Sequence, residues 1–96
     1  MSVRVRLYPP LNTTAHRDRL ELSLGEEPCL GGLVTRLVER FGPDFRRHFY
    51  DDRDRLVPAW CAFVNGKAVH FNRPEALSCP LQEGDEVDFL LALAGG

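Results

Sequence analysis

The sequence ends in Ala94-Gly95-Gly96, directly after an apolar run, and these residues could support one kind of chemistry. A terminal carboxylate is a poor electrophile until it is esterified or adenylated. Two glycines before it leave the carbonyl carbon unhindered, because glycine has no Cβ, and allow the segment to extend into a narrow cleft. Incidental glycines at a frayed terminus are the alternative explanation. The rest of the sequence must decide between a reactive tail and a frayed end.

No other set of side chains forms a recognisable catalytic site. The three histidines lie in separate predicted loops or strand ends, without metal-ligand spacing to one another or to a cysteine. The three cysteines share no CxxC spacing, which argues against a zinc site or a disulfide framework and favours a reducing cytoplasm. The acidic residues near the C-terminus are interpreted as solvated surface. We therefore expect a non-catalytic chain with no metal site and no bound cofactor. The residues considered are His16, His48, His70, Cys29, Cys61, Cys79, Glu83, Asp85, Glu86 and Asp88.

Composition favours one small globular domain over residues 1–96. The chain is 44% hydrophobic and 27% charged, which is ordinary for a folded protein. Its net charge of −2, with basic residues spread along the chain, gives no reason to expect a nucleic-acid partner. The N-terminus alternates and does not resemble a signal peptide, and no stretch approaches the length of a membrane span. We predict a cytoplasmic protein with no nucleic-acid and no membrane partner.

Alternating patterns predict the strands. Residues 3–8 and 19–24 each place apolar side chains on one face, which favours an antiparallel pair joined by a loop over 11–18. An apolar run over 59–64 meets Asn65-Gly66, which is typical of a type I′ hairpin turn. A return strand over 67–71 and a last strand over 86–91 complete the set.

One amphipathic helix is predicted over residues 30–41. Apolar residues recur there at helical spacing, and Gly42-Pro43 should end the helix. Gly31-Gly32 weakens its first turn, so the helix could begin after them. Phe45 and Phe49 should hold one short helical turn against the core, and Asp51 to Arg55 should form a solvated turn. The apolar stripe comprises Leu30, Leu33, Val34, Leu37, Val38 and Phe41.

These elements predict an α+β fold in which one main helix packs on one face of a mixed sheet of four to five strands. The first and last strands should occupy the middle of the sheet. Residues 92–96 should then project beyond the domain as an exposed tail.

The motifs, taken in order, resemble the MoaD/ThiS sulfur-carrier family, which has the ubiquitin-like β-grasp fold. The resemblance covers nearly the whole chain. It rests on "VRVRLY", "LELSL", "LGGLVTRL", "FVNGK", "LQEGDEVDFL" and the terminal "AGG". The most specific parts are Val64-Asn65-Gly66, Gly84-Asp85-Glu86-Val87 and Ala94-Gly95-Gly96.

The resemblance implies a function in sulfur transfer. Gly96 would be adenylated by a ubiquitin-activating-like enzyme and converted to a thiocarboxylate. ATP and the sulfur donor would be supplied through that enzyme. A second partner, such as the large subunit of molybdopterin synthase, would accept the sulfur for the molybdenum or tungsten cofactor. The tail residues Leu91, Ala92, Leu93, Ala94 and Gly95 would thread into the partner, and Phe89 and Leu90 would help to form the docking face.

Other functions remain open at this point. Carriers for cysteine synthesis, thiamine thiazole or tRNA thiolation share the fold and the tail. A ubiquitin-like protein modifier, joined through Gly96 to lysines of other proteins, would also need them. In a simple interaction module the terminal glycines would be incidental.

Overall fold

A computed structural model describes residues 1–26 and 28–91 of the chain. In this part, five strands form one mixed sheet in the order β2-β1-β5-β3-β4. Strands β1 and β5 are parallel, and the other neighbouring strands are antiparallel. The predicted α+β class is confirmed, and the first and last strands lie inside the sheet as expected. The elements are β1 (Ser2–Leu7), α1 (Leu11–Ala15), β2 (Arg19–Ser23), α2 (Leu30–Phe41), α3 (Pro43–Phe49), β3 (Trp60–Val64), β4 (Lys67–His70), the 3₁₀ turn η1 (Ala76–Ser78) and β5 (Glu86–Leu91).

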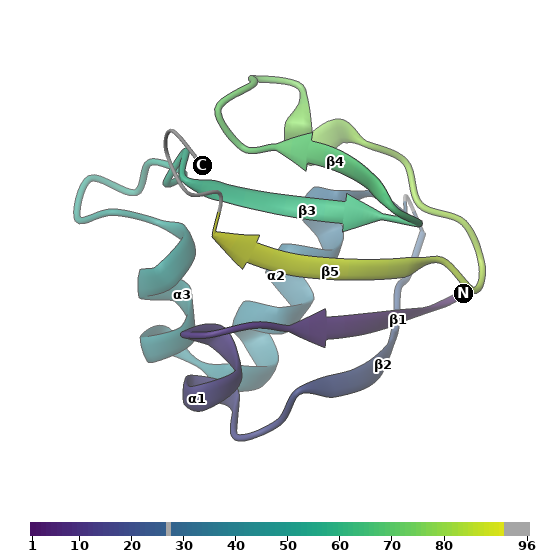
Figure 1. Ribbon diagram of the computed structural model, residues 1–96, viewed down its shortest axis with the longest axis horizontal. Helices are drawn as coiled ribbons and strands as arrows, with labels where there is room; N and C mark the ends of the chain where they lie inside the picture. The colour runs from purple at the N-terminus through teal and green to yellow at the C-terminus, as the bar shows by residue number, and fades with distance from the viewer. Residues whose placement is uncertain (27, 92–96) are drawn as a thin grey trace.

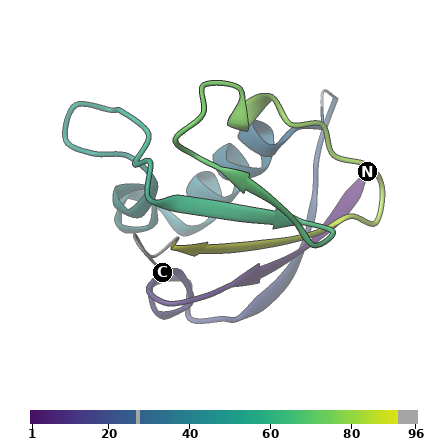
Figure 2. The ribbon, with the colours of Figure 1, turned by 45° about the horizontal axis from the view of Figure 1, so that its top comes forward.

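The helices gather on one side of the sheet. Figure 1 shows α2 crossing behind the sheet, with α1 and α3 beside the end toward which β1 and β5 point. The same arrangement is seen after rotation in Figure 2. We call the helix-covered side the inner face, and the opposite side, over which no described helix lies, the outer face.

Strand alternation builds the core. Val5 of β1 pairs with Leu20 of β2 and with Val87 of β5, so three apolar side chains meet in one row of the inner face. All of them are buried. From α2, the buried side chains are Leu30, Leu33, Val34 and Leu37. The predicted helical stripe and the predicted strand faces therefore enclose one core.

Helix α2 begins at Leu30, before the two glycines, so the interpretation that it starts after them is wrong. The side chain of Cys29 caps the helix by accepting a hydrogen bond from the Gly32 amide at 3.4 Å. A Cβ on Gly31 would lie 3.0 Å from the carbonyl oxygen of Leu77. Glycine therefore permits the first turn of α2 to approach η1 closely, and this packing outweighs its weak helix propensity.

Residues 11–18 were expected to form only a turn, yet Leu11–Ala15 form the short helix α1. Leu11 is completely buried and Ala15 lies one helical turn later on the same side. Thr14 Oγ1 lies 2.8 Å from Nε2 of His48, which joins α1 to α3. Tertiary contacts thus override the polar composition of this segment.

Helix α3 is the helical turn predicted around Phe45 and Phe49, extended to seven residues. Gly42 has φ +89° and ψ −170°, so it is not the left-handed cap expected after α2. Pro43 instead begins α3, where its missing N–H has no cost.

An aromatic cluster holds α3 against the sheet. The ring of Phe49 lies 5.1 Å from that of Trp60 and 5.5 Å from that of Phe89, between centroids. Phe45 and Phe71 flank it at 5.6 and 6.1 Å. The indole N–H of Trp60 donates to the carbonyl oxygen of His48, so its polar atom has a partner in the buried cluster.

The β3–β4 hairpin has the predicted turn. Asn65 and Gly66 have φ angles of +52° and +86°, as a type I′ turn requires. Asn65 also accepts a hydrogen bond from the Glu86 amide at 3.0 Å and donates to Asp85 at 2.9 Å. The hairpin is therefore fixed to the start of β5.

Replacing Phe49 should test the importance of the aromatic cluster. Because the ring is completely buried, Phe49→Ala should lower the free energy of unfolding by about 3–5 kcal/mol in urea denaturation. The half-buried Phe63 on the outer face provides a matched control, and Phe63→Ala should cost less than half as much. Equal losses for the two variants would contradict this account of the core.

Candidate functional site

The candidate site is the end of β5, where the chain leaves the sheet toward Gly96. Strand β5 is paired with β1 as far as Phe89, which lies opposite Leu7, and with β3 as far as Leu91, which lies opposite Trp60. The Tyr8 amide extends the pairing by donating to the Phe89 carbonyl at 3.3 Å. The tail is thus attached to the centre of the sheet, beside α1 and α3 (Figure 1).

The two expected docking residues lie on opposite faces of β5. Phe89 has no exposed surface and belongs to the aromatic cluster, so its proposed direct contact with a partner is wrong for this conformation. The reason is the two-residue period of a strand, which turns Phe89 inward and its neighbour Leu90 outward. Leu90 is half-buried on the outer face and remains available to a partner.

Leu90 belongs to an apolar strip on the outer face. It pairs with Cys61 of β3, while Phe63 pairs with Asp88 of β5 and with Ala68 of β4. Side chains paired in this way point to the same face. We call Leu90, Cys61, Phe63 and Ala68 the outer apolar strip. The strip crosses β5, β3 and β4. Its Leu90–Cys61 pair lies one residue before the end of β5.

The outer apolar strip changes the properties of one thiol. Cys61 is only 2% exposed, and its burial raises the pKa of its thiol above the usual range. A buried thiol with a raised pKa is a poor nucleophile. Cys61 therefore acts as a small apolar group in the strip, in agreement with a structural rather than a catalytic assignment.

The tail itself lies outside the described residues. Ala92, Leu93, Ala94, Gly95 and Gly96 therefore keep the roles expected for them as predictions. Of the expected threading residues, the structure describes Leu91, whose side chain is 38% exposed. Leu91 lies on the inner side of β5, beyond the covered core.

A charged loop lies near the same end of the sheet. Tyr50 and Leu56 form an isolated antiparallel bridge, which closes the loop between α3 and β3. Asp51 accepts hydrogen bonds from the amides of Arg55 and Arg53 at 3.0 and 2.8 Å. These bonds, that of Arg55 first, lower the pKa of the Asp51 carboxyl. The predicted solvated turn is thus confirmed, because residues 51–55 are all exposed, and these hydrogen bonds fix its conformation.

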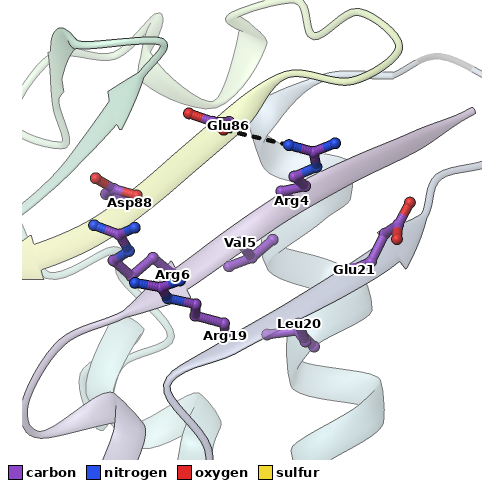
Figure 3. A pocket seen from close by; sticks show the side chains of 8 residues that line it. All are labelled: Arg4, Val5, Arg6, Arg19, Leu20, Glu21, Glu86 and Asp88. Carbon is purple, nitrogen blue, oxygen red and sulfur yellow. Dashed lines mark ion pairs between the residues drawn. The ribbon is translucent and has the colours of Figure 1, made fainter.

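A shallow hollow lies on the other half of the outer face. It has a volume of about 400 Å³ and lies over β2, β1 and the first half of β5. Figure 3 shows the charged side chains around it. The sequence did not predict the hollow, because Arg19 lies beside Arg4 and Arg6 only through the β1–β2 register.

Over residues 1–26 and 28–91, no group of three or more histidine, cysteine, aspartate or glutamate side chains could hold a metal ion. In the same ranges, no helix has the length and apolar character needed to cross a membrane.

Comparison with known proteins establishes the fold. No protein-family model matches this sequence, and no curated protein does. Among solved structures, SAMP1 from Haloferax volcanii matches with a TM-score of 0.81, 21% identity and full coverage of both chains. The small archaeal modifier protein 1 (SAMP1) from Methanosarcina acetivorans has a TM-score of 0.76 and 24% identity, over 99% of this chain and 96% of the other. A putative molybdopterin converting factor, subunit 1, from Pyrococcus furiosus has a TM-score of 0.71 and 21% identity, over 97% and 99%.

The chain has the ubiquitin-like β-grasp fold. The match extends over nearly the whole length of each of these structures. At these identities the likeness is one of fold.

Alkylation should test whether Leu90 shields the thiol of Cys61 within the outer apolar strip. With iodoacetamide at pH 8, Cys61 should react more slowly than the half-buried Cys29 and Cys79, as measured by peptide mass spectrometry. Leu90→Ala should speed the reaction of Cys61 several-fold, whereas Leu91→Ala, on the other face, should not. Equal reaction of all three thiols in the unaltered protein would contradict the structure.

Proposed function

We propose that this protein is a sulfur carrier related to the MoaD/ThiS family. Its C-terminal Gly96 would carry the sulfur, and other enzymes would perform the chemistry. The carrying observation is the combination of a β-grasp domain with a central strand that leads directly into Ala94-Gly95-Gly96. The likeness to a putative molybdopterin converting factor subunit supports this assignment.

The proposed cycle begins with activation of the tail. The Gly96 carboxylate attacks the α-phosphate of ATP on a ubiquitin-activating-like enzyme, which forms an acyl adenylate and releases pyrophosphate. A sulfide equivalent from the sulfur donor then attacks the acyl carbon, AMP leaves, and a thiocarboxylate remains. Because Gly95 and Gly96 lack Cβ atoms, the activating enzyme can close around the acyl group.

The second half of the cycle delivers the sulfur. The thiocarboxylate sulfur attacks an electrophilic carbon of a substrate held by the acceptor enzyme and displaces a leaving group, which forms a thioester between carrier and substrate. Water then attacks the thioester carbonyl and the acyl–sulfur bond breaks, so the carrier leaves as its carboxylate and the sulfur stays on the substrate as a thiolate. The domain contributes position, since β5 fixes the base of the tail while Leu90 and the outer apolar strip provide an apolar docking surface. In this proposal the chain is non-catalytic and works in the cytoplasm.

We assign the acceptor to the large subunit of a molybdopterin synthase, with the molybdenum or tungsten cofactor as the eventual product. The full-length likeness to the molybdopterin converting factor subunit favours this choice. Acceptors in cysteine, thiazole or tRNA thiolation are the competing assignments. Incubating the sulfur-loaded protein with each purified acceptor, and measuring which one discharges it, decides between them.

A second candidate function is covalent modification of other proteins. The likeness to small archaeal modifier protein 1 is the observation that favours it. Activation would be the same, but a lysine amine would attack the adenylated Gly96 and form an isopeptide bond with release of AMP. Immunoblots of lysates that contain an N-terminally tagged chain should then show adducts of higher mass, which deletion of Gly96 removes.

Intact mass spectrometry should test the sulfur-carrier proposal. After co-expression with the activating enzyme and a sulfur donor, a fraction of the protein should gain the mass expected when sulfur replaces one oxygen. Deletion of Gly96 should abolish this change and leave the melting curve unaltered. Ala92→Gly, which keeps both terminal glycines, should still be converted.

Two results would contradict the proposal. If the unaltered chain never gained sulfur in the presence of an active enzyme, Gly96 would not be the carrier group. If deletion of Gly96 lowered the melting temperature strongly, the terminal glycines would have a structural role.

A further inference from the structure

The hollow on the outer face is surrounded by equal numbers of opposite charges. Three arginines and three carboxylates line it, above the backbone at Val5 and Leu20. Figure 3 shows the arginine side chains reaching across the hollow, from β1 and β2. The charged lining residues are Arg4, Arg6, Arg19, Glu21, Glu86 and Asp88.

The strand register arranges these charges in two rows. In the first row Arg4 of β1 lies between Glu21 of β2 and Glu86 of β5. This row alternates in sign, and Arg4 Nη1 lies 3.6 Å from Glu86 Oε1. Each charge therefore has an opposite neighbour, and the first row is electrostatically satisfied by the protein itself.

The second row is not satisfied in this way. Arg6 of β1 lies between Asp88 of β5 and Arg19 of β2, so two arginines are directly opposite each other. Directly paired like charges destabilise a sheet. Both guanidinium groups remain charged at any physiological pH. Among the described residues, no carboxylate comes within ion-pair distance of Arg19.

Arg6 does have neighbours that stabilise its charge. Its Nη1 atom donates to the Tyr8 hydroxyl at 3.4 Å, and this contact, followed by the field of Asp88, raises the pKa of Arg6. Arg19 has no corresponding contact in the described part of the chain. The unfavourable Arg6–Arg19 pair therefore leaves positive potential concentrated on the Arg19 side of the hollow.

We propose that this hollow receives a carboxylate side chain of a protein partner, which bridges Arg6 and Arg19. Such a carboxylate would supply the opposite charge that the second row lacks. The hollow continues into the outer apolar strip, because Asp88 pairs with Phe63 on the same face. An apolar centre with a charged edge is the usual composition of a specific interface. This inference rests on the proposed function, in which an activating or acceptor enzyme docks on the outer face.

The carboxylates around the hollow select the type of anion. Glu86 and Asp88 border the hollow on β5, and Glu21 borders it on β2. A nucleic-acid backbone carries a row of negative charges, and part of that row would lie over these acidic neighbours. A single carboxylate can lie over the two arginines and avoid the acidic neighbours. The partner should therefore present an isolated Asp or Glu at this position.

The first test uses the protein alone. A capped peptide with a single Glu between neutral residues (Gly-Gly-Glu-Gly-Gly), titrated into the labelled full chain, should shift the NMR signals of the Arg6 and Arg19 amides and Nε–H groups. Arg19→Glu should abolish these shifts. Arg73→Glu, which makes the same charge change at another exposed position, should keep them. Shifts spread evenly over the arginines, or equal shifts with inorganic phosphate, would overturn the proposal.

Thermal melting tests the unfavourable pair itself. At low ionic strength, Arg19→Glu should raise the melting temperature by roughly 1–5 °C relative to Arg73→Glu, because an opposite-charge pair replaces a like-charge pair. The difference should disappear in high salt. A lower melting temperature for Arg19→Glu would show that the pair is not unfavourable, and the proposal would fail.

The third test separates this inference from the proposed function. With the activating enzyme, Arg19→Glu should raise the KM for the carrier about tenfold or more, with kcat retained, whereas Arg73→Glu should leave both unchanged. Normal conversion of Arg19→Glu with an unchanged KM would refute the docking role and leave the sulfur-carrier function intact. If the unaltered chain were not converted at all, the sulfur-carrier function would fail, and the peptide titration would still decide whether the hollow accepts a carboxylate.

Discussion

Strand β5 pairs with β1 in parallel orientation as far as Phe89 and with β3 in antiparallel orientation as far as Leu91, so both of its edges are bonded through Phe89. This constraint fixes how its side chains are used. Val87 and Phe89 have no exposed surface and hold the strand to the core, while Asp88 and Leu90 face outward. A tail attached to such a strand has a rigid base, because displacing that base would break pairing on two sides and expose Phe89. Such a base suits the proposed function, in which separate enzymes load and unload the carrier while its domain stays folded.

The helical end of the domain strengthens this base. Phe49 of α3 contacts Phe89 of β5 and Trp60 of β3, so one ring connects the helix with two central strands. The Trp60 indole donates to the His48 carbonyl, and His48 in turn contacts Thr14 of α1. Helices α1 and α3 therefore form one packed unit beside the end of β5. The domain is small and its core is limited. Many of its buried aromatic rings lie at this position, where β5 ends.

Sequence patterns predicted the strands, the main helix and the type I′ turn, because each depends on local periodicity or on residues that tolerate positive φ. They failed where a tertiary contact decides the outcome. Helix α1 forms in a polar segment because Leu11 is buried. Helix α2 includes Gly31 because its first turn packs against Leu77 too closely for a residue with a Cβ. The docking role expected for Phe89 disagrees with the strand pattern itself, because the alternation along β5 turns Leu90 outward and Phe89 into the core. The Arg6–Arg19 pair could not be predicted from the sequence, since the β1–β2 register decides which outward side chains of the two strands lie opposite each other.

The outer face has two parts, the outer apolar strip and the charged hollow over β1 and β2. This division explains how one fold could bind different partners. The inner face is determined by packing, so it tolerates little change, and in the proposed function the terminal glycines are required by acyl activation. The outer positions of β1 and β2 have neither constraint, because their side chains are exposed and contribute little to stability. Their charges can therefore change at small cost to the fold, and a mismatched charge discriminates strongly against a wrong partner. An unfavourable pair such as Arg6–Arg19 is informative for this reason. Because these positions contribute little to stability, the fold does not require two opposed arginines, and the proposed contact with a partner carboxylate accounts for the pair.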